Sequence, residues 1–263
     1  MSEPLKVPTM AEFMAQGKQP EVLFWVGCAG SFDDRAQKIT KAFVKLLNNA
    51  RVEFAVLGTE ESCTGDPAKR AGNEFLFQMQ AMANIKVLNS YKIKKIVTAC
   101  PHCFNTFKNE YPVLGGNYEV MHHTQFLKSL LSEGRLKVEG GKYKGKRITF
   151  HDPCYLGRAN NEYEAPRFLL RKLEVELIEM KRCKSKGLCC GAGGAQMFKE
   201  PEPGDKDINI ERTEEALETK PSIIAAACPF CNTMMTDGVK AKEKETDIKV
   251  MDIAEMIANA DDL

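Results

Sequence analysis

Short apolar runs alternate along the chain with longer segments whose apolar residues recur at helical spacing. The runs have the length and composition of buried strands, and each is followed closely by a cysteine. In the first half they are "EVLFWV" (21–26), "VEFAV" (52–56) and "KIVTAC" (95–100). In the second half they are "RITF" (147–150) and "SIIAAAC" (222–228). These runs predict strands, each of which ends shortly before a cysteine.

The segments between the strands are typical of helices. Residues 69–91 have the length and composition of one long helix, and a strand and a helix close each half at 118–131 and 248–260. One face of residues 34–47 is formed by Ala36, Ile39, Phe43 and Leu47. Strands that alternate with helices predict parallel sheets with right-handed crossovers. The expected fold class is therefore α/β, with a small parallel sheet flanked by helices in each half.

A change in composition separates the two halves. The segment "EGGKYKGKR" is rich in Gly and Lys and has no apolar period, so we place a linker at residues 139–146. The first domain is then 21–138 and the second is 147–263. Residues 1–20 form an N-terminal extension with a short helix expected around 10–16.

Charge and hydropathy exclude two broad classes of function. The 263 residues include 37 Lys and Arg against 36 Asp and Glu, so there is no electrostatic case for nucleic acid binding. The apolar stretches are too short to span a bilayer, and the sequence begins without a charged segment that leads into an apolar one. We expect a cytoplasmic protein without a membrane span, in which the ten cysteines stay reduced for metal or redox chemistry.

Nine of the ten cysteines form an internal repeat. The order Cys, Cys-x-Gly, Cys-x-x-Cys occurs twice, and the second copy lies 126 to 128 residues after the first. The members are Cys28, Cys63, Cys100 and Cys103 in the first half, and Cys154, Cys189, Cys190, Cys228 and Cys231 in the second. Because ligands collect at the carboxyl ends of parallel strands, we expect one metal site per half.

The cysteine pattern is compatible with zinc or with iron–sulfur clusters, because both use Cys-x-x-Cys. Four thiolates complete a tetrahedral zinc, whereas the second half offers five, through the adjacent pair Cys189 and Cys190 in "GLCCGAGG". A fifth thiolate favours something larger than one zinc ion. Gly191 and its neighbours would let the backbone approach the sulfurs closely.

The motifs "HDPCYLGR", "CCGAGG" and "CPFC" resemble the cysteine-rich CCG domain of the heterodisulfide reductase B-subunit family. The resemblance covers residues 22–258. The segments "SCTGDPAKRAGNEFLFQMQ", "CPHCFNTFKNEYP" and "DINIERTEEAL" are more narrowly similar to the soluble part of electron-transfer-flavoprotein:menaquinone oxidoreductases. In those larger proteins a haem-bearing membrane region and a ferredoxin-like region precede the CCG domains, so the resemblance implies a partner subunit that supplies them.

The resemblance also implies the cofactors. In that family five cysteines hold a non-cubane four-iron cluster, and the adjacent pair helps to join its two parts; the second half matches this set. The first half departs from it, because Thr64 stands where Cys190 stands in the repeat. Its four thiols suffice for an ordinary four-iron cluster or for zinc, and we expect a four-iron cluster there.

Other residues near the cysteines have less specific signals. His151 and Asp152 precede Cys154 and would support the cluster through hydrogen bonds or simply end the strand. His102, inside Cys-Pro-His-Cys, is expected to be an exposed turn residue rather than a ligand or proton donor. The remaining expectations concern Thr64 and Gly191 as supporting residues, His122 and His123 at a strand-to-helix junction where they could form a cap, and Cys183 as a free, partly exposed thiol.

Three functions follow from these expectations. The leading one is an iron–sulfur electron-transfer subunit that takes electrons from a flavoprotein or organic donor and passes them to a membrane quinone through a partner at the inner membrane face. The second is a disulfide reductase whose substrate is cleaved at the second-half cluster, with Cys189 and Cys190 as the candidate catalytic residues. The third is a scaffold protein stabilised by zinc, which has no redox role.

Overall fold

Two four-stranded parallel sheets form the framework of the protein. The computed structural model describes residues 5–200 and 203–260. The first sheet has the strand order β2-β1-β3-β4 and the second has β6-β5-β7-β8. The strands are β1 (Val22–Trp25), β2 (Phe54–Ala55), β3 (Lys95–Thr98), β4 (Glu119–His122), β5 (Arg147–Phe150), β6 (Glu176–Leu177), β7 (Ile223–Ala226) and β8 (Lys249–Asp252). The α/β fold expected from the apolar periodicity is confirmed.

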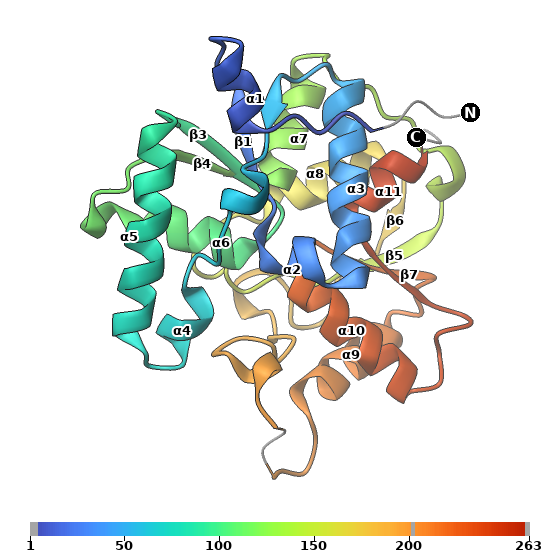
Figure 1. The fold of residues 1–263 in the computed structure, drawn as a ribbon. Helices are drawn as coiled ribbons and strands as arrows, with labels where there is room; N and C mark the ends of the chain where they lie inside the picture. Colours follow the sequence, from blue (N-terminus) through green and yellow to red (C-terminus); the bar gives the residue numbers. More distant parts are fainter. Residues whose placement is uncertain (1–4, 201–202, 261–263) are drawn as a thin grey trace.

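Helices connect successive strands and cover the sheets (Figure 1). The α-helices are α1 (Met10–Ala15), α2 (Gly27–Phe32), α3 (Asp34–Asn49), α4 (Asp66–Arg70), α5 (Glu74–Ser90), α6 (Pro101–Asn105), α7 (His123–Ser132), α8 (Glu164–Lys172), α9 (Ile208–Glu218), α10 (Pro229–Ala241) and α11 (Ile253–Ala260). Short turns of other helix types are η1 (Gly58–Glu60), η2 (Thr106–Glu110), η3 (Tyr111–Leu114), η4 (Gly141–Tyr143), η5 (Lys184–Lys186) and η6 (Gln196–Phe198).

The two sheets repeat one pairing register. Leu23 pairs with Ile96 in the first sheet, and Thr149 pairs with Ile224 in the second. These partners differ by 126 and 128 positions, which are the offsets between the cysteines of the two halves. The cysteines therefore follow structurally equivalent strand ends in both halves.

The long helix expected over residues 69–91 is wrong. The chain forms α4, breaks, and starts again as α5. Gly72 adopts φ +87°, a left-handed conformation that ends a helix readily, and the Asn73 side chain accepts a hydrogen bond from the backbone N–H of Leu76 at 3.0 Å, which caps α5.

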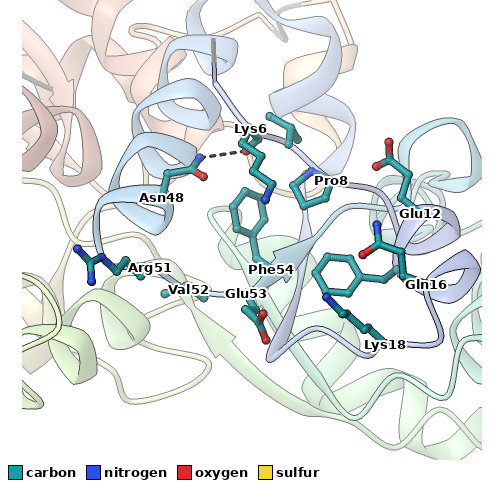
Figure 2. A pocket seen from close by; sticks show the side chains of 12 residues that line it. Lys6, Pro8, Glu12, Gln16, Lys18, Asn48, Arg51, Val52, Glu53 and Phe54 are labelled. Atoms are coloured by element: carbon teal, nitrogen blue, oxygen red, sulfur yellow. Dashed lines mark hydrogen bonds between the residues drawn. The ribbon is translucent and has the colours of Figure 1, made fainter. Parts of the chain in front are cut away.

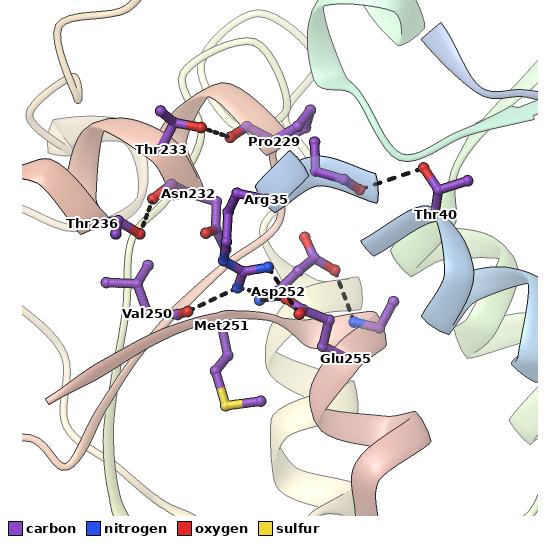
Figure 3. Close-up of polar contacts among 12 residues, drawn as sticks. Arg35, Thr40, Pro229, Asn232, Thr233, Thr236, Val250, Met251, Asp252 and Glu255 are labelled. Atoms are coloured by element: carbon purple, nitrogen blue, oxygen red, sulfur yellow. Dashed lines mark hydrogen bonds and ion pairs between the residues drawn. The ribbon is translucent and has the colours of Figure 1, made fainter. Parts of the chain in front are cut away.

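The two halves are packed together through helix α3. In Figure 1, α3 of the first half runs beside α11 of the second. Figure 3 shows how Arg35 on α3 reaches across: its Nη2 lies 2.7 Å from Oε2 of Glu255 and 2.9 Å from the carbonyl oxygen of Val250. A single apolar core also draws on both halves, including Phe24, Phe43, Phe126, Phe150 and Ile257.

The N-terminal segment docks against the edge strand β2. Helix α1 begins after Thr9, whose side chain and that of Glu12 form a capping box. The backbone N–H of Met10 donates to the carbonyl of Val56 at 2.9 Å, and Met10 is buried. A groove between this segment and the end of α3 is shown in Figure 2, where Asn48 donates to the carbonyl of Lys6. The helix expected near residues 10–16 is confirmed.

Among residues 5–200 and 203–260, no helix combines the length and apolar character that crossing a membrane requires.

Candidate metal centres

Four cysteines of the first half converge on one small cavity at the carboxyl ends of β1 and β3. Cys28 lies in α2, Cys63 in the loop before α4, and Cys100 caps α6, whose first turn contains Pro101 and Cys103. The lining comprises Val26, Gly27, Cys28, Ala29, Cys63, Thr64, Asp66, Pro67, Cys100, His102, Cys103 and Phe230. Phe230 belongs to the second half, so the cavity lies against the junction between the halves.

The thiols of this first site influence one another's ionisation. A hydrogen bond with Cys28 lowers the pKa of Cys63 to about 6, and the pKa of Cys28 is raised in return. A hydrogen bond with Cys103 likewise lowers the pKa of Cys100 to about 7. Backbone N–H donors add to the effect, because Gly65 donates to Sγ of Cys63 at 3.4 Å. The pKa of Cys103 is raised in return, so within each pair one thiol is favoured as the thiolate, the form that binds metals, while its partner keeps the proton.

Five cysteines of the second half form a continuous chain of contacts. Sγ of Cys190 lies 3.3 Å from Sγ of Cys231. Cys189 is hydrogen-bonded to both Cys154 and Cys190. Cys231 is hydrogen-bonded to Cys228 in addition to Cys190. Hydrogen bonds from Cys154 and Cys190 hold the pKa of the Cys189 thiol far below its usual range. The whole set thus lies close enough to share one metal group.

Glycines occupy equivalent positions in the two sites. Gly191 donates its backbone N–H to Sγ of Cys189 at 3.3 Å, as Gly65 does to Cys63. Both glycines have positive φ, +92° for Gly191 and +88° for Gly65, a conformation that L side chains rarely adopt. The glycine of each Cys-x-Gly motif therefore allows the backbone to turn an N–H toward sulfur.

Thr64 lies at the place that the repeat assigns to it. Its Oγ1 is 3.9 Å from Sγ of Cys103, whereas the equivalent atoms of Cys190 and Cys231 are 3.3 Å apart. Thr64 is buried, so its hydroxyl faces the thiols rather than solvent.

The expectation that His102 is an exposed turn residue is wrong. Its side chain is buried in α6, and Nδ1 lies 2.9 Å from Oδ2 of Asp66. Its ring also packs against two second-half rings, with centroids 4.4 Å from Tyr155 and 5.2 Å from Phe230. Burial alone would lower the pKa of His102, but the Asp66 carboxylate and the nearby thiols raise it to about 9. The sequence around His102 does not indicate this burial, because its partner Asp66 lies 36 positions away.

His151 lies beside the second site. One of its ring nitrogens and the Sγ atoms of Cys190 and Cys231 all lie within 4.8 Å of one another. Nδ1 accepts a hydrogen bond from Nε of Arg212 at 3.0 Å, while Nε2 is buried and has no partner among the described residues. Burial and the Arg212 charge lower the pKa of His151 to about 3, so the imidazole is neutral.

Asp152, by contrast, is engaged away from the thiols. Its carboxylate forms a two-bond pair with the Arg167 guanidinium, at 2.8 and 2.9 Å, and accepts the backbone N–H of Lys184 at 2.7 Å. Arg167 also binds Glu179 at 2.6 Å. This ion-pair network fixes the segment that follows β5.

His122 and His123 lie at the strand-to-helix junction, as expected, and His122 forms a capping box with Gln125. His123 reaches the second half, where its Nε2 lies 2.9 Å from Oδ1 of Asp252. Cys183, outside the repeat, is a free and half-buried thiol.

The donor sets fit an iron–sulfur group in both halves. Four sulfurs converge on the first cavity, and the second site offers one thiol more than a tetrahedral zinc needs. Beside the second site, Nε2 of the buried His151 ring has no partner among the described residues. Such an atom is costly unless a bound group accepts its hydrogen bond.

Comparison with known families agrees with this geometry. A family model described as "Cysteine-rich domain" (CCG) matches residues 22–108 and again residues 148–236. Each match includes one strand-helix repeat with its cysteines. The two matches together cover more than half of the chain.

Three curated relatives are informative. The chain is 48% identical to "Probable iron-sulfur-binding oxidoreductase FadF" of Bacillus subtilis, over 97% of this chain and 36% of that protein. It is 47% identical to "EtfAB:quinone oxidoreductase" of Syntrophomonas wolfei, over 93% of this chain and 35% of that protein. It is 36% identical to the D subunit of the "Dihydromethanophenazine:CoB--CoM heterodisulfide reductase" of Methanosarcina barkeri, over 91% of this chain and 59% of that protein. The chain thus spans about a third of the length of the first two relatives.

Proposed function

We propose that this chain, which belongs to the cysteine-rich CCG domain family, is the iron–sulfur electron-transfer part of an oxidoreductase. The observation that carries the proposal is the doubled thiol arrangement at the ends of two equivalent sheets. The names of the relatives, which include an iron–sulfur-binding oxidoreductase and a quinone oxidoreductase, support the same class of chemistry.

The nine repeated cysteines would hold two clusters. A four-iron cluster in the first half would be held by Cys28, Cys63, Cys100 and Cys103, and a non-cubane four-iron cluster in the second half by Cys154, Cys189, Cys190, Cys228 and Cys231. When bound, such clusters accept and release single electrons. The backbone N–H groups of Gly65 and Gly191 would stabilise the negative charge on the sulfurs.

The two sites lie close enough to act together. Phe230, between Cys228 and Cys231, lines the first cavity and packs on the His102 ring. Cysteines of both halves also belong to one apolar cluster with Trp25 and Phe107. An electron at one site would therefore reach the other through packed protein, in surroundings from which water is excluded.

The partners would be a flavoprotein or organic donor on one side and a quinone on the other. A ferredoxin-like or membrane-bound iron–sulfur unit would connect this chain to the quinone and hold it at the inner face of the membrane. The motive is the 47% identity to a protein named for electron-transfer flavoprotein and quinone. Because the chain spans about a third of that relative, the connecting unit would be a further domain or a separate subunit.

Metal analysis after anaerobic purification tests the cofactor. Iron, zinc and acid-labile sulfide per chain are measured, with electron paramagnetic resonance on the same sample. About eight irons with matching sulfide are expected for two four-iron clusters, and about four would assign a cluster to one half only. Stoichiometric zinc without sulfide would overturn the redox function.

Electron exchange tests the role. The loaded protein with its partner unit is expected to pass electrons between a reduced flavoprotein and a menaquinone analogue. The matched control is the Cys189→Ser variant, whose second-half cluster should be lost or altered. Failure of the loaded complex to transfer electrons, with both clusters present, would reject this specific pairing.

A second candidate is disulfide reduction at the second-half cluster, with Cys189 and Cys190 beside the reacting sulfur. It is favoured by the 36% identity to one polypeptide of a heterodisulfide reductase. Turnover of disulfides that depends on the cluster would support it. Absence of turnover over a range of small disulfides, with the cluster loaded and a reductant supplied, would reject it.

A further inference from the structure

Trp25 and His151 occupy the same position in the two halves. Trp25 is the last residue of β1, and His151 directly follows β5. Trp25 pairs with Thr98 on β3, and the backbone N–H of His151 donates to Ala225 on β7 at 2.9 Å. The two residues are 126 positions apart, the offset between Cys28 and Cys154.

Each of these side chains has a buried ring nitrogen without a partner. Nε1 of Trp25 and Nε2 of His151 lack a hydrogen-bond partner among the described residues, and both side chains are fully buried. An indole nitrogen is a donor only. An N–H group left unpaired in the interior is costly, so an acceptor is expected at each place.

Arg212 determines which nitrogen of His151 bears the proton. The guanidinium of Arg212 can only donate, and its Nε donates to Nδ1 of His151 at 3.0 Å. Nδ1 must therefore present a lone pair, and in a neutral ring the proton is then on Nε2. Arg212 is held in place by the carbonyl of Arg182 at 2.8 Å and by Glu215 at 3.0 Å. His151 thus has an N–H donor where a metal ligand would need a lone pair.

Sulfur atoms of the two sites lie near these two side chains. A ring nitrogen of His151 lies within 4.8 Å of Sγ of Cys190 and of Cys231, and Nε2 is the nitrogen left free. In the first half, a Cβ added at Gly27 would lie 3.4 Å from Sγ of Cys103 and 4.0 Å from Cδ1 of Trp25. The indole edge next to Nε1 and the Cys103 sulfur are thus both close neighbours of Gly27.

We propose that His151 and Trp25 are paired positioning residues that donate N–H hydrogen bonds to the sulfurs of the second-half and first-half clusters, with Arg212 holding His151 in the donor tautomer. This assignment rests on the proposed iron–sulfur function. His151 is a donor and not a ligand. N–H donors stabilise the more negative, reduced cluster, so each one raises the reduction potential of its own site.

The first experiment measures the reduction potential of each cluster in the loaded full chain by a titration followed by electron paramagnetic resonance. His151→Leu is expected to lower the potential of the second-half cluster alone, and Trp25→Phe that of the first-half cluster alone. Each variant is the control for the other, and His151→Gln, which restores an N–H of similar reach, is expected to recover most of the shift. Iron and sulfide content should remain unchanged in all three.

The outcomes separate this assignment from the function on which it rests. If both clusters are loaded and neither reduction potential changes in the two variants, the hydrogen-bond roles of His151 and Trp25 are wrong, while the proposed function is unaffected. A nitrogen hyperfine coupling of metal-bound size that disappears in His151→Leu would make His151 a ligand and also overturn it. Absence of iron and sulfide from the unsubstituted protein would overturn the proposed function first.

A second measurement determines the tautomer of His151 in protein that contains no cluster. Nitrogen-15 NMR of the metal-free full chain, labelled at histidine, is expected to show His151 protonated at Nε2. Arg212→Met is expected to release the ring into a mixture of tautomers. Protonation at Nδ1 in the unsubstituted protein would overturn the role given to Arg212.

Discussion

The hydroxyl oxygen of Thr64 lies 3.9 Å from Sγ of Cys103, at the repeat position where the Cys190 sulfur lies 3.3 Å from that of Cys231. A single side chain thus distinguishes the donor sets of the two sites. Because Thr64 is buried and points at the thiols, a cysteine placed there would present its sulfur to the same group.

Thr64→Cys is therefore expected to give the first half a fifth thiolate and to change the paramagnetic resonance signal of its cluster toward that of the second half. Thr64→Ser is the matched control, since it retains a hydroxyl. The measurement is the spectrum of the reduced and oxidised loaded protein. Identical spectra for the two variants would contradict the equivalence of Thr64 and Cys190.

Gly65→Ala is expected to destabilise the protein more than Gly72→Ala. Both glycines have φ near +88°, which costs a residue with a side chain about 1–2 kcal/mol. A Cβ at Gly65 would also lie 2.8 Å from Cδ2 of Phe77, whereas a Cβ at Gly72 has nothing within 4 Å. Overpacking adds about 1–3 kcal/mol at Gly65. Urea unfolding measures the difference, and equal losses would show that Phe77 moves away freely.

The bond between His123 and Asp252 is expected to stabilise the junction of the two halves. Both side chains are fully buried; His123 bonds Oδ1 of Asp252, and Oδ2 has no hydrogen-bond partner among the described residues. His123→Leu should lower the free energy of unfolding by about 1–3 kcal/mol, because it leaves a buried carboxylate with fewer donors. The exposed Lys144–Glu174 pair is the control, for which Glu174→Gln should change the free energy of unfolding far less, because solvent screens the pair. Equal effects in chemical unfolding would argue against the prediction.

Arg167→Met is expected to lower the free energy of unfolding by roughly 3–5 kcal/mol, because it leaves the buried Asp152 carboxylate without its two-bond partner. Adding Asp152→Asn should recover part of that loss. If the role of Asp152 is to fix the segment after β5, the double variant should keep the potential of the second-half cluster. A shifted potential with normal stability would instead assign Asp152 to the cluster.

Several parts of the structure were predictable because they depend on local chemistry. The strands before Cys28 and Cys228 follow from short apolar runs, and the helix containing Ile39 and Phe43 follows from one apolar face. The break at Gly72 does not follow from the apolar pattern, because apolar residues continue on both sides of it. The signal that could have revealed it was the pair Gly72-Asn73, a helix end followed by a helix cap.

The sequence by itself determined the α/β class and the double cysteine register, because apolar period and spacing are properties of short segments. Only the tertiary structure decided what surrounds the thiols. His102 meets Asp66 from 36 positions away, Arg212 meets His151 from 61, and His123 meets Asp252 from 129. Such partners depend on how helices from separate crossovers pack at the strand ends, and no local pattern encodes that packing.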